Sequence, residues 1–324
     1  MLVTENPIFQ LAIFPGGVFA LFFGLLLKGI DCKVRARLQC GVGPALLQPF
    51  FDLVKLSRKG DPVKATANER IFGASILLGI AAVAAATMPV LIGGIYGKGD
   101  ALIGLPWIPF LLAVPTLALL AAERLSGAHF AAVRFTRELT LLLIWEGALL
   151  LVLFSLVLKV GMNSGGPVVF SLPEILRFQQ ERGPLLFDPT LLPAFVTYLF
   201  FIPALAGEGP FGLGQAEAEF VEGPAHEFSK PVLALFQMMS ALRMVAALGL
   251  GVALFFPAEQ GGSLLLGLSW FFLKCLLLTL ASLSLARTTG GHFRIDQLVR
   301  LFWKWPAALG LTSLILVLIT RSSP

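Results

Sequence analysis

Residues 231–256 read PVLALFQMMSALRMVAALGLGVALFF, and Arg243 is the only charged residue in the run. A helix needs about 20 apolar residues to cross a bilayer core roughly 30 Å thick. Lipid offers no hydrogen-bond partner to the backbone, so a spanning segment of this kind must be helical. We therefore expect a transmembrane helix here, with a cation near its centre.

Similar runs lie on both sides of this stretch, at 8–30, 71–95, 104–122, 138–158, 188–206, 263–286 and 303–320. Hydrophobic residues make up 57% of the chain, charged residues 13%, and the mean hydropathy is +0.86. A soluble domain has about one quarter charged residues. The runs are also too long for the ~10-residue strands of an outer-membrane barrel. We predict an all-α polytopic membrane bundle of about eight transmembrane helices, with residues 1–324 forming one membrane domain.

The basic residues predict how the chain is oriented. Loops 31–70, 123–137, 207–230 and 287–302 hold 15 of the 24 Lys and Arg residues. Cytoplasmic loops of membrane proteins carry such an excess. We expect these loops on the cytoplasmic side of the cytoplasmic membrane and both termini outside. The net charge of +5 is then a consequence of topology and does not indicate a nucleic-acid partner.

The first cytoplasmic loop contains a second kind of helix. In the sequence QPFFDLVKL, Phe50, Leu53 and Val54 share one side at helical spacing, while Asp52 and Lys55 lie on the other. Such a pattern is typical of an amphipathic helix at the membrane surface. The helix either anchors the loop among lipid headgroups or serves as a docking element, and the preceding GVGP turn favours docking.

Among the charged residues inside the predicted spans, four are singled out: Glu146 well within its span, Glu138 at the start of the same span, and Arg243 and Lys274 at the centres of theirs. A charge at the bilayer centre costs at least ~2.5–3.5 kcal/mol, so it usually pairs with another charge or lines water. Glu138 and Glu146 are eight residues apart, about 80° around a helix and ~12 Å along it, so both can face one polar seam. They form either a proton-transfer path or a structural pair neutralised by Arg134, Arg137 or Arg243.

The third cytoplasmic loop is acidic where positive charge is expected. It carries Glu208, Glu217, Glu219, Glu222 and Glu227. If a docked subunit covers the loop, like charges raise one another's pKa and the cluster can store protons. If nothing covers it, the loop is a solvated acidic segment.

The cysteines give no sign of a metal site. Cys32, Cys40 and Cys275 form no CxxC pair and have no histidine at ligand spacing. We expect no metal or other cofactor on this chain, no catalytic residue, and any redox centre in a partner.

Several motifs resemble the complex I subunit that joins the peripheral arm to the membrane, a family that includes the matching subunit of energy-converting membrane-bound nickel-iron hydrogenases. The resemblance spans nearly the whole chain. The matching residues are Arg35, Ala36, Arg37, Gln39, Gly41, Gly43, Pro44, Gln48, Pro49, Asp52, Lys55 and Leu56; Ser126, Gly127, Arg134, Arg137, Glu138 and Glu146; Pro210, Phe211, Glu217, Glu219, Gly223, Glu227, Phe228 and Ser229; and Arg294, Asp296, Arg300 and Trp303.

Two details favour the hydrogenase branch of that family. Only three residues separate Gly43-Pro44 from Gln48-Pro49, whereas quinone-reducing members generally have a longer insertion here. The R-x-x-R-E run that ends at Glu138 also resembles hydrogenase members. The alternatives are the quinone-site bridging subunit of a complex I-type enzyme and an unrelated secondary transporter.

The resemblance implies a role in a larger complex. The partners would be soluble hydrogenase large and small subunits, iron-sulfur subunits and antiporter-like membrane subunits, with iron-sulfur clusters and a nickel-iron centre in those partners. This chain would anchor the soluble module in the lipid bilayer and couple its ferredoxin-linked redox reaction to proton or sodium translocation.

The resemblance also assigns roles to individual residues. Two carboxylates of the family's acidic loop are missing, because Gly212 and Gln215 stand in their places. By function, the candidates are as follows: Glu138, Glu146, Glu217, Glu219 and Glu227 for proton transfer; Arg134, Arg137, Arg243, Lys274, Arg294 and Asp296 for a charge network; and Arg35, Arg37, Gln48, Asp52 and Lys55 for docking.

Overall fold

The computed structural model describes residues 7–58, 67–97, 104–126, 131–164, 170–206, 230–258, 264–289 and 295–322. These residues contain helices and no strand, as the sequence predicts. The helices are α1 (Pro7–Ala12), α2 (Gly17–Leu38), α3 (Gln48–Arg58), α4 (Ala67–Tyr96), α5 (Trp107–Ser126), α6 (Ala131–Ser164), α7 (Leu172–Arg182), η1 (Leu185–Phe187), α8 (Leu192–Ala206), α11 (Lys230–Phe255), α12 (Leu264–Leu278), η3 (Thr279–Ser284), α13 (Leu285–Thr289), α14 (Ile295–Phe302), η4 (Trp303–Ala307) and α15 (Ala308–Ser322).

Seven helical segments in the described part of the chain are long and apolar enough to cross a membrane. They correspond to seven of the eight expected spans. The remaining one, expected at 188–206, is the shorter helix α8, because residues 188–191 form a turn before it. At 1.5 Å per residue its 15 residues extend only about 22 Å.

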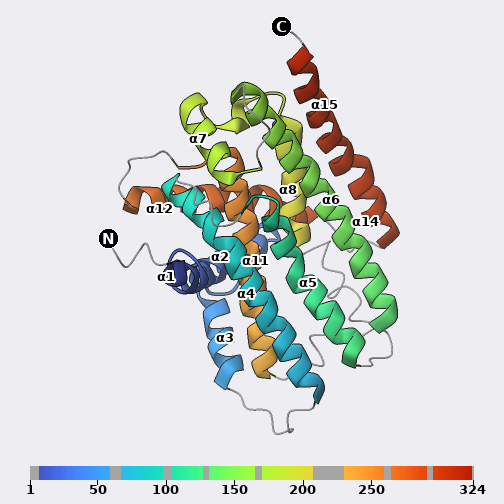
Figure 1. The fold of residues 1–324 in the computed structure, drawn as a ribbon. Helices are drawn as coiled ribbons and strands as arrows, with labels where there is room; N and C mark the ends of the chain where they lie inside the picture. Colours follow the sequence, from blue (N-terminus) through green and yellow to red (C-terminus); the bar gives the residue numbers. More distant parts are fainter. Residues whose placement is uncertain are drawn as a thin grey trace.

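Helix α11 lies at the centre of the bundle (Figure 1). In its most apolar window 83% of residues are buried, against 28% in the span that contains α12. It packs against α2, α3, α4 and α8. The run that first indicates a membrane protein is therefore also the helix around which the others assemble.

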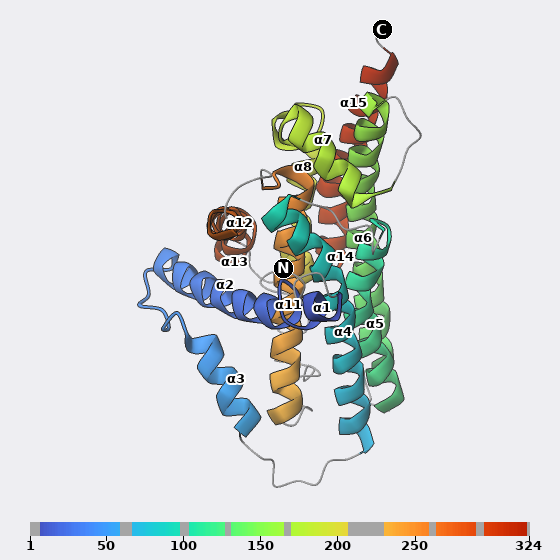
Figure 2. The ribbon, with the colours of Figure 1, turned by 60° about the vertical axis from the view of Figure 1, so that its left-hand side comes forward.

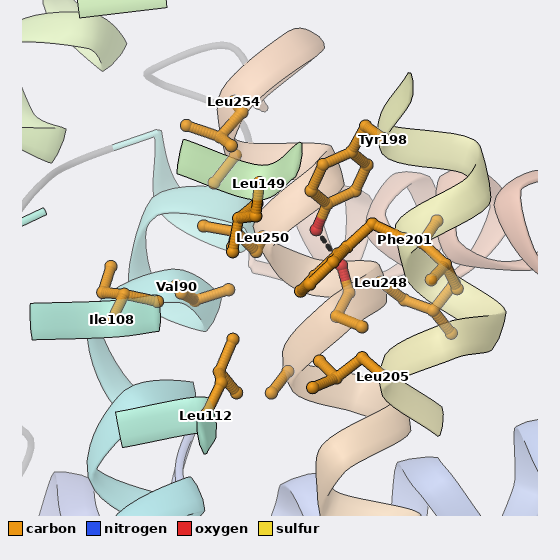
Figure 3. Close-up of a cluster of buried hydrophobic side chains, with 14 of the residues drawn as sticks. Val90, Ile108, Leu112, Leu149, Tyr198, Phe201, Leu205, Leu248, Leu250 and Leu254 are labelled. Carbon is orange, nitrogen blue, oxygen red and sulfur yellow. Dashed lines mark hydrogen bonds between the residues drawn. The ribbon is translucent and has the colours of Figure 1, made fainter. Parts of the chain in front are cut away.

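Apolar side chains from α4, α5, α6 and α8 meet those of α11 in the core (Figure 3). The Tyr198 ring is fully buried there, and its hydroxyl donates a hydrogen bond of 2.5 Å to the Ala247 carbonyl. A buried hydroxyl needs such a partner. This contact fixes α8 against α11 despite the shortness of α8.

Helices α2 and α12 run across the direction of α11, α2 in Figure 2 and α12 in Figure 1. Helix α2 reaches α11 closely at Gly24, where an added Cβ would lie 2.5 Å from the Ala241 carbonyl oxygen. A larger residue at position 24 would push the two helices apart.

The amphipathic helix of the first loop is confirmed as α3. The GVGP turn leads into it with Gly43 at φ +62°, a left-handed conformation that glycine adopts without strain. Phe50 packs on Phe22 of α2 with ring centroids 4.8 Å apart. Phe51 and Val54 are exposed, so α3 keeps an apolar face available to lipid or to a partner.

Candidate functional site

Glu146 on α6 and Arg243 on α11 interact electrostatically. The Oε1 atom of Glu146 and the Nε atom of Arg243 are buried, and neither makes a hydrogen bond with the residues that the structure describes. Buried polar atoms are normally hydrogen-bonded. This carboxylate and guanidinium therefore retain bonding capacity for water, for a transferred proton or for a partner's side chain.

Glu138 shares the same cation. Arg243 interacts electrostatically with Glu138 as well as with Glu146. The two carboxylates lie about two helical turns apart on α6, so one guanidinium influences both. Arg137, beside Glu138, is half-buried and has an interaction of its own. Arg134 lies on the first turns of α6, and its side chain is outside the described part of the structure.

Sequence reasoning missed a buried carboxylate on the neighbouring helix. Glu123 is only 4% exposed and lies on α5, which packs against α6. The predicted span ended at residue 122, so Glu123 was assigned to a loop, whereas α5 continues to Ser126. The last turn of α5 is amphipathic and directs its carboxylate toward the bundle. That pattern could have identified Glu123 from the sequence.

A second cation approaches the same stretch of α11 from α2. The Lys28 Nζ atom donates a hydrogen bond of 2.7 Å to Ser240 Oγ. Ser240 precedes Arg243 by three residues, about one helical turn. Polar groups from α2, α6 and α11 thus gather along one segment of the central helix.

A further ion pair connects α2 with α13, and sequence reasoning missed it too. Asp31 is fully buried and accepts hydrogen bonds from Ser284, at 2.7 Å, and from Arg287. Ser284 ends the π-helical segment η3, whose wider turn changes the direction of the residues that follow. The predicted first span ended at residue 30, one residue before Asp31, while α2 continues to Leu38.

Lys274 lies far from Arg243 along α11. Its Nζ atom donates hydrogen bonds of 2.9 Å to the carbonyls of Phe256 and Pro257, just past the end of α11. Phe256 lies 13 residues beyond Arg243, about 20 Å along the helix axis. Lys274 thus satisfies carbonyls at the negative end of α11, as a cation there should.

The candidate docking residues lie at the end of α2 and on α3. Arg35 and Arg37 are in the last turn of α2, and their carbonyls accept hydrogen bonds from the turn that follows. On α3, Gln48 donates a hydrogen bond of 2.8 Å to Asp52. Lys55 is exposed one turn further along. Phe50 packs on Phe22, which lies 13 residues before Arg35 and about 20 Å from it along α2, so the two polar stretches lie at separate places.

The acidic loop with Glu217, Glu219 and Glu227 lies outside the described residues, as does Arg294. Asp296 is exposed in the first turn of α14. Among the residues that are described, no group of three or more His, Cys, Asp or Glu side chains could hold a metal ion.

The spans, the interfacial helix and the charges held between helices define a polytopic membrane protein of the helix-bundle class. More particularly, the chain belongs to the NADH dehydrogenase family, whose model matches residues 12–318. It is a multi-span membrane subunit of a complex I-like respiratory complex.

Individual relatives agree with this family. NADH-quinone oxidoreductase subunit 8 of Thermus thermophilus is 31% identical over 85% of this chain and 76% of its own length. An NADH-quinone oxidoreductase subunit of Syntrophobacter fumaroxidans is 31% identical over 91% of this chain and 90% of its own length. Among solved structures, a chain of the membrane-bound sulfane sulfur reductase, an archaeal respiratory membrane complex, aligns with a TM-score of 0.81 and 26% identity, covering 96% of this chain and 99% of that one.

Proposed function

We propose that this chain anchors a soluble electron-transfer module to the membrane and couples its redox reaction to ion translocation, in the hydrogenase branch of the family. The observation that carries the proposal is the Glu146–Arg243 group, with its buried atoms that make no hydrogen bond within the described residues. A charge at this depth is costly to maintain and typically marks an ion or proton path. The chain would act as one membrane domain over residues 1–324.

Docking would use two polar stretches, Arg35 and Arg37 at the end of α2 and Gln48, Asp52 and Lys55 on α3. Their mixed charges suit a polar rim, and the exposed apolar residues of α3 suit a protein or lipid contact. The module, with its iron-sulfur clusters and nickel-iron centre in partner subunits, would sit on the cytoplasmic side, and both termini would face outward.

The residues that couple the redox reaction to ion translocation would be Glu138, Glu146 and Arg243. A proton that binds or leaves either carboxylate changes the electrostatic interaction of that carboxylate with Arg243, so both sites act on the same cation. Glu217, Glu219 and Glu227 would deliver protons from the cytoplasmic side. Arg134, Arg137, Arg294 and Asp296 would set the local potential. Moving one charge against 100 mV requires about 2.3 kcal/mol, which a modest redox step supplies.

One observation supports the hydrogenase branch: the short spacing between Gly43-Pro44 and Gln48-Pro49 matches that branch. Coverage does not separate the branches, because the chain covers 99% of the archaeal sulfane sulfur reductase subunit and 90% of the Syntrophobacter quinone oxidoreductase subunit. The curated relatives are, however, quinone oxidoreductase subunits, so the quinone-site bridging subunit is the second candidate.

Purification of the native complex through a tag on this chain tests the proposal. Mass spectrometry would identify the co-purifying subunits, and parallel assays would measure hydrogen evolution, sulfane sulfur reduction and quinone reduction with a reduced ferredoxin-like donor. Nickel-iron and antiporter-like subunits with hydrogen evolution are the expected result. Quinone reduction without hydrogen would assign the chain to the second candidate, and sulfur reduction without hydrogen would contradict the hydrogenase branch.

A further inference from the structure

The junction of α14 and α15 exposes two cations between two large aromatic rings. Trp303 is 77% exposed and Trp305 is 52% exposed, and Arg300 and Lys304 are exposed beside them. The Lys304 Nζ atom lies 5.8 Å from the centre of the Trp305 ring. Exposed tryptophans at the start of an apolar span are typical of the boundary between lipid and water.

The opposite side of this segment is packed against the bundle, which fixes the direction of the exposed side. Leu298, Phe302 and Pro306 are buried. Helix α14 contacts α6, and η4 contacts α6 and α8. The exposed residues are therefore held in place by the fold.

The four exposed side chains are arranged as a compact polar cluster. Arg300 and Lys304 are four residues apart, so they lie about one turn and ~6 Å from each other on the same side. Trp303 and Trp305 are the neighbours of Lys304 in sequence and flank it on either side of the helix. Two donors that can converge on one anion are thus bordered by two amphipathic rings.

An apolar track continues from this cluster along α15. Leu311 and Ile315 are four residues apart on α15, so they lie on one side of that helix, and both are exposed. A phospholipid matches this order, because its anionic phosphate is followed by apolar acyl chains. A free phosphate ion or an acidic protein segment would leave the apolar track uncovered.

We propose that Arg300 and Lys304 bind the phosphate of an anionic phospholipid, with Trp303 and Trp305 beside its glycerol region and Leu311 and Ile315 along an acyl chain. Asp296 lies one turn before Arg300, so its negative charge opposes the binding of an anion there. Arg300, Lys304, Trp303 and Trp305 are not among the residues assigned to docking or coupling, whereas Asp296 is also a candidate for the charge network.

The test is native mass spectrometry of the purified complex, titrated in detergent with phosphatidylglycerol and, separately, with phosphatidylcholine. Each cation near a membrane surface contributes about a fivefold gain in affinity for anionic lipid, so Arg300→Gln/Lys304→Gln should weaken phosphatidylglycerol binding by roughly 25-fold. Phosphatidylcholine binding should change little. Arg177→Gln/Arg182→Gln on α7 is the control with the same change in charge.

A single variant keeps the test decisive if the double variant fails to assemble. Asp296→Asn removes the competing carboxylate from an exposed position and should strengthen phosphatidylglycerol retention. The proposal is overturned by unchanged retention in both variants, by equal loss of the two lipids, by displacement with inorganic phosphate alone, or by a protein subunit found covering Trp303 in the complex.

Discussion

Two carboxylates in this bundle, Asp31 and Glu146, are held in opposite ways. Both oxygens of the fully buried Asp31 accept hydrogen bonds, one from Ser284 and one from Arg287. Glu146 faces Arg243 electrostatically, yet its buried Oε1 makes no hydrogen bond within the described residues. The first arrangement engages both oxygens of its carboxylate, and the second leaves one oxygen available.

This contrast distinguishes charges that stabilise the fold from charges proposed to take part in coupling. A buried ion pair contributes little net stability compared with apolar packing, but removing one partner is costly because the other charge remains buried. Asp31 should therefore matter for assembly. A group that must exchange a proton needs an oxygen that is not already engaged, and the buried Oε1 of Glu146 makes no hydrogen bond within the described residues.

The largest effect is expected from Arg287→Leu. The substitution leaves the Asp31 carboxylate buried without its cation and should destabilise the subunit by about 3–5 kcal/mol. The measurement is the thermal midpoint of the purified complex and the yield of this chain in it.

The double variant Asp31→Asn/Arg287→Leu is the control for that prediction. Removing both charges should restore a substantial part of the lost stability, because no uncompensated ion remains. Equal instability of the single and double variants would mean that the pair acts through shape and not through charge.

Glu146→Gln tests the other side of the contrast. The amide keeps the size of the side chain but cannot exchange a proton, so ion transport in proteoliposomes should fall about 100-fold at normal redox turnover. Thermal stability should stay near that of the unmodified complex. Exposed Glu181 on α7 offers a matched Glu→Gln control.

Retained pumping in Glu146→Gln would remove this residue from the coupling path. Loss of stability similar to that of Arg287→Leu would instead make Glu146 a structural partner of Arg243, the alternative that the sequence leaves open. The two readouts therefore distinguish the roles directly.

The sequence predicted one of these regions better than the other. Length and hydropathy located the spans, and the rarity of charges within them singled out Glu146 and Arg243. Asp31 and Glu123 escaped notice because each stands just beyond a predicted span end, where a charge normally faces water. Hydropathy averages over neighbouring residues and does not show which side of the last turn faces the bundle.

Long-range partners were also beyond sequence reasoning. Lys274 was grouped with the central charges because it is central in its span, yet it binds carbonyls about 20 Å along α11 from Arg243. The way α12 crosses α11 determines which part of α11 the Lys274 side chain contacts. The π-helical turn of η3, which places Ser284 and Arg287 near Asp31, has no recognised signal in the sequence.

Lys274→Met tests a cation whose hydrogen bonds are satisfied within the fold. The variant loses two charge-assisted hydrogen bonds to the end of α11 and should lose about 1.5–3 kcal/mol of stability. Ion transport per redox turnover should remain normal. A coupling defect in a stable Lys274→Met complex would return this residue to the charge network. Arg177→Met, at an exposed position on α7, serves as the control substitution for stability.

The smallest effect is expected at Asp188, a satisfied carboxylate outside the spans. It forms a 2.8 Å ion pair with Lys159 and accepts hydrogen bonds from Thr190. Burial raises the pKa of Asp188, but the bonds from Lys159 and Thr190 outweigh it and hold the pKa below its ordinary value. A lowered folded-state pKa means that the stabilisation is present above the unfolded-state value, about 3.9, and is lost as the pH falls through the folded-state value.

Asp188→Asn should therefore cost about 0.5 kcal/mol or less near neutral pH, because the pair is partly exposed and screened. The difference from the unmodified protein should shrink as the pH falls below about 4, where the native carboxyl also becomes neutral. Thermal midpoints between pH 3 and pH 7 measure this, with exposed Glu174→Gln as the control. A difference that persists unchanged in acid would show that Asp188 holds the turn before α8 by shape alone, and its ion pair would then lose its place among the charges that stabilise this fold.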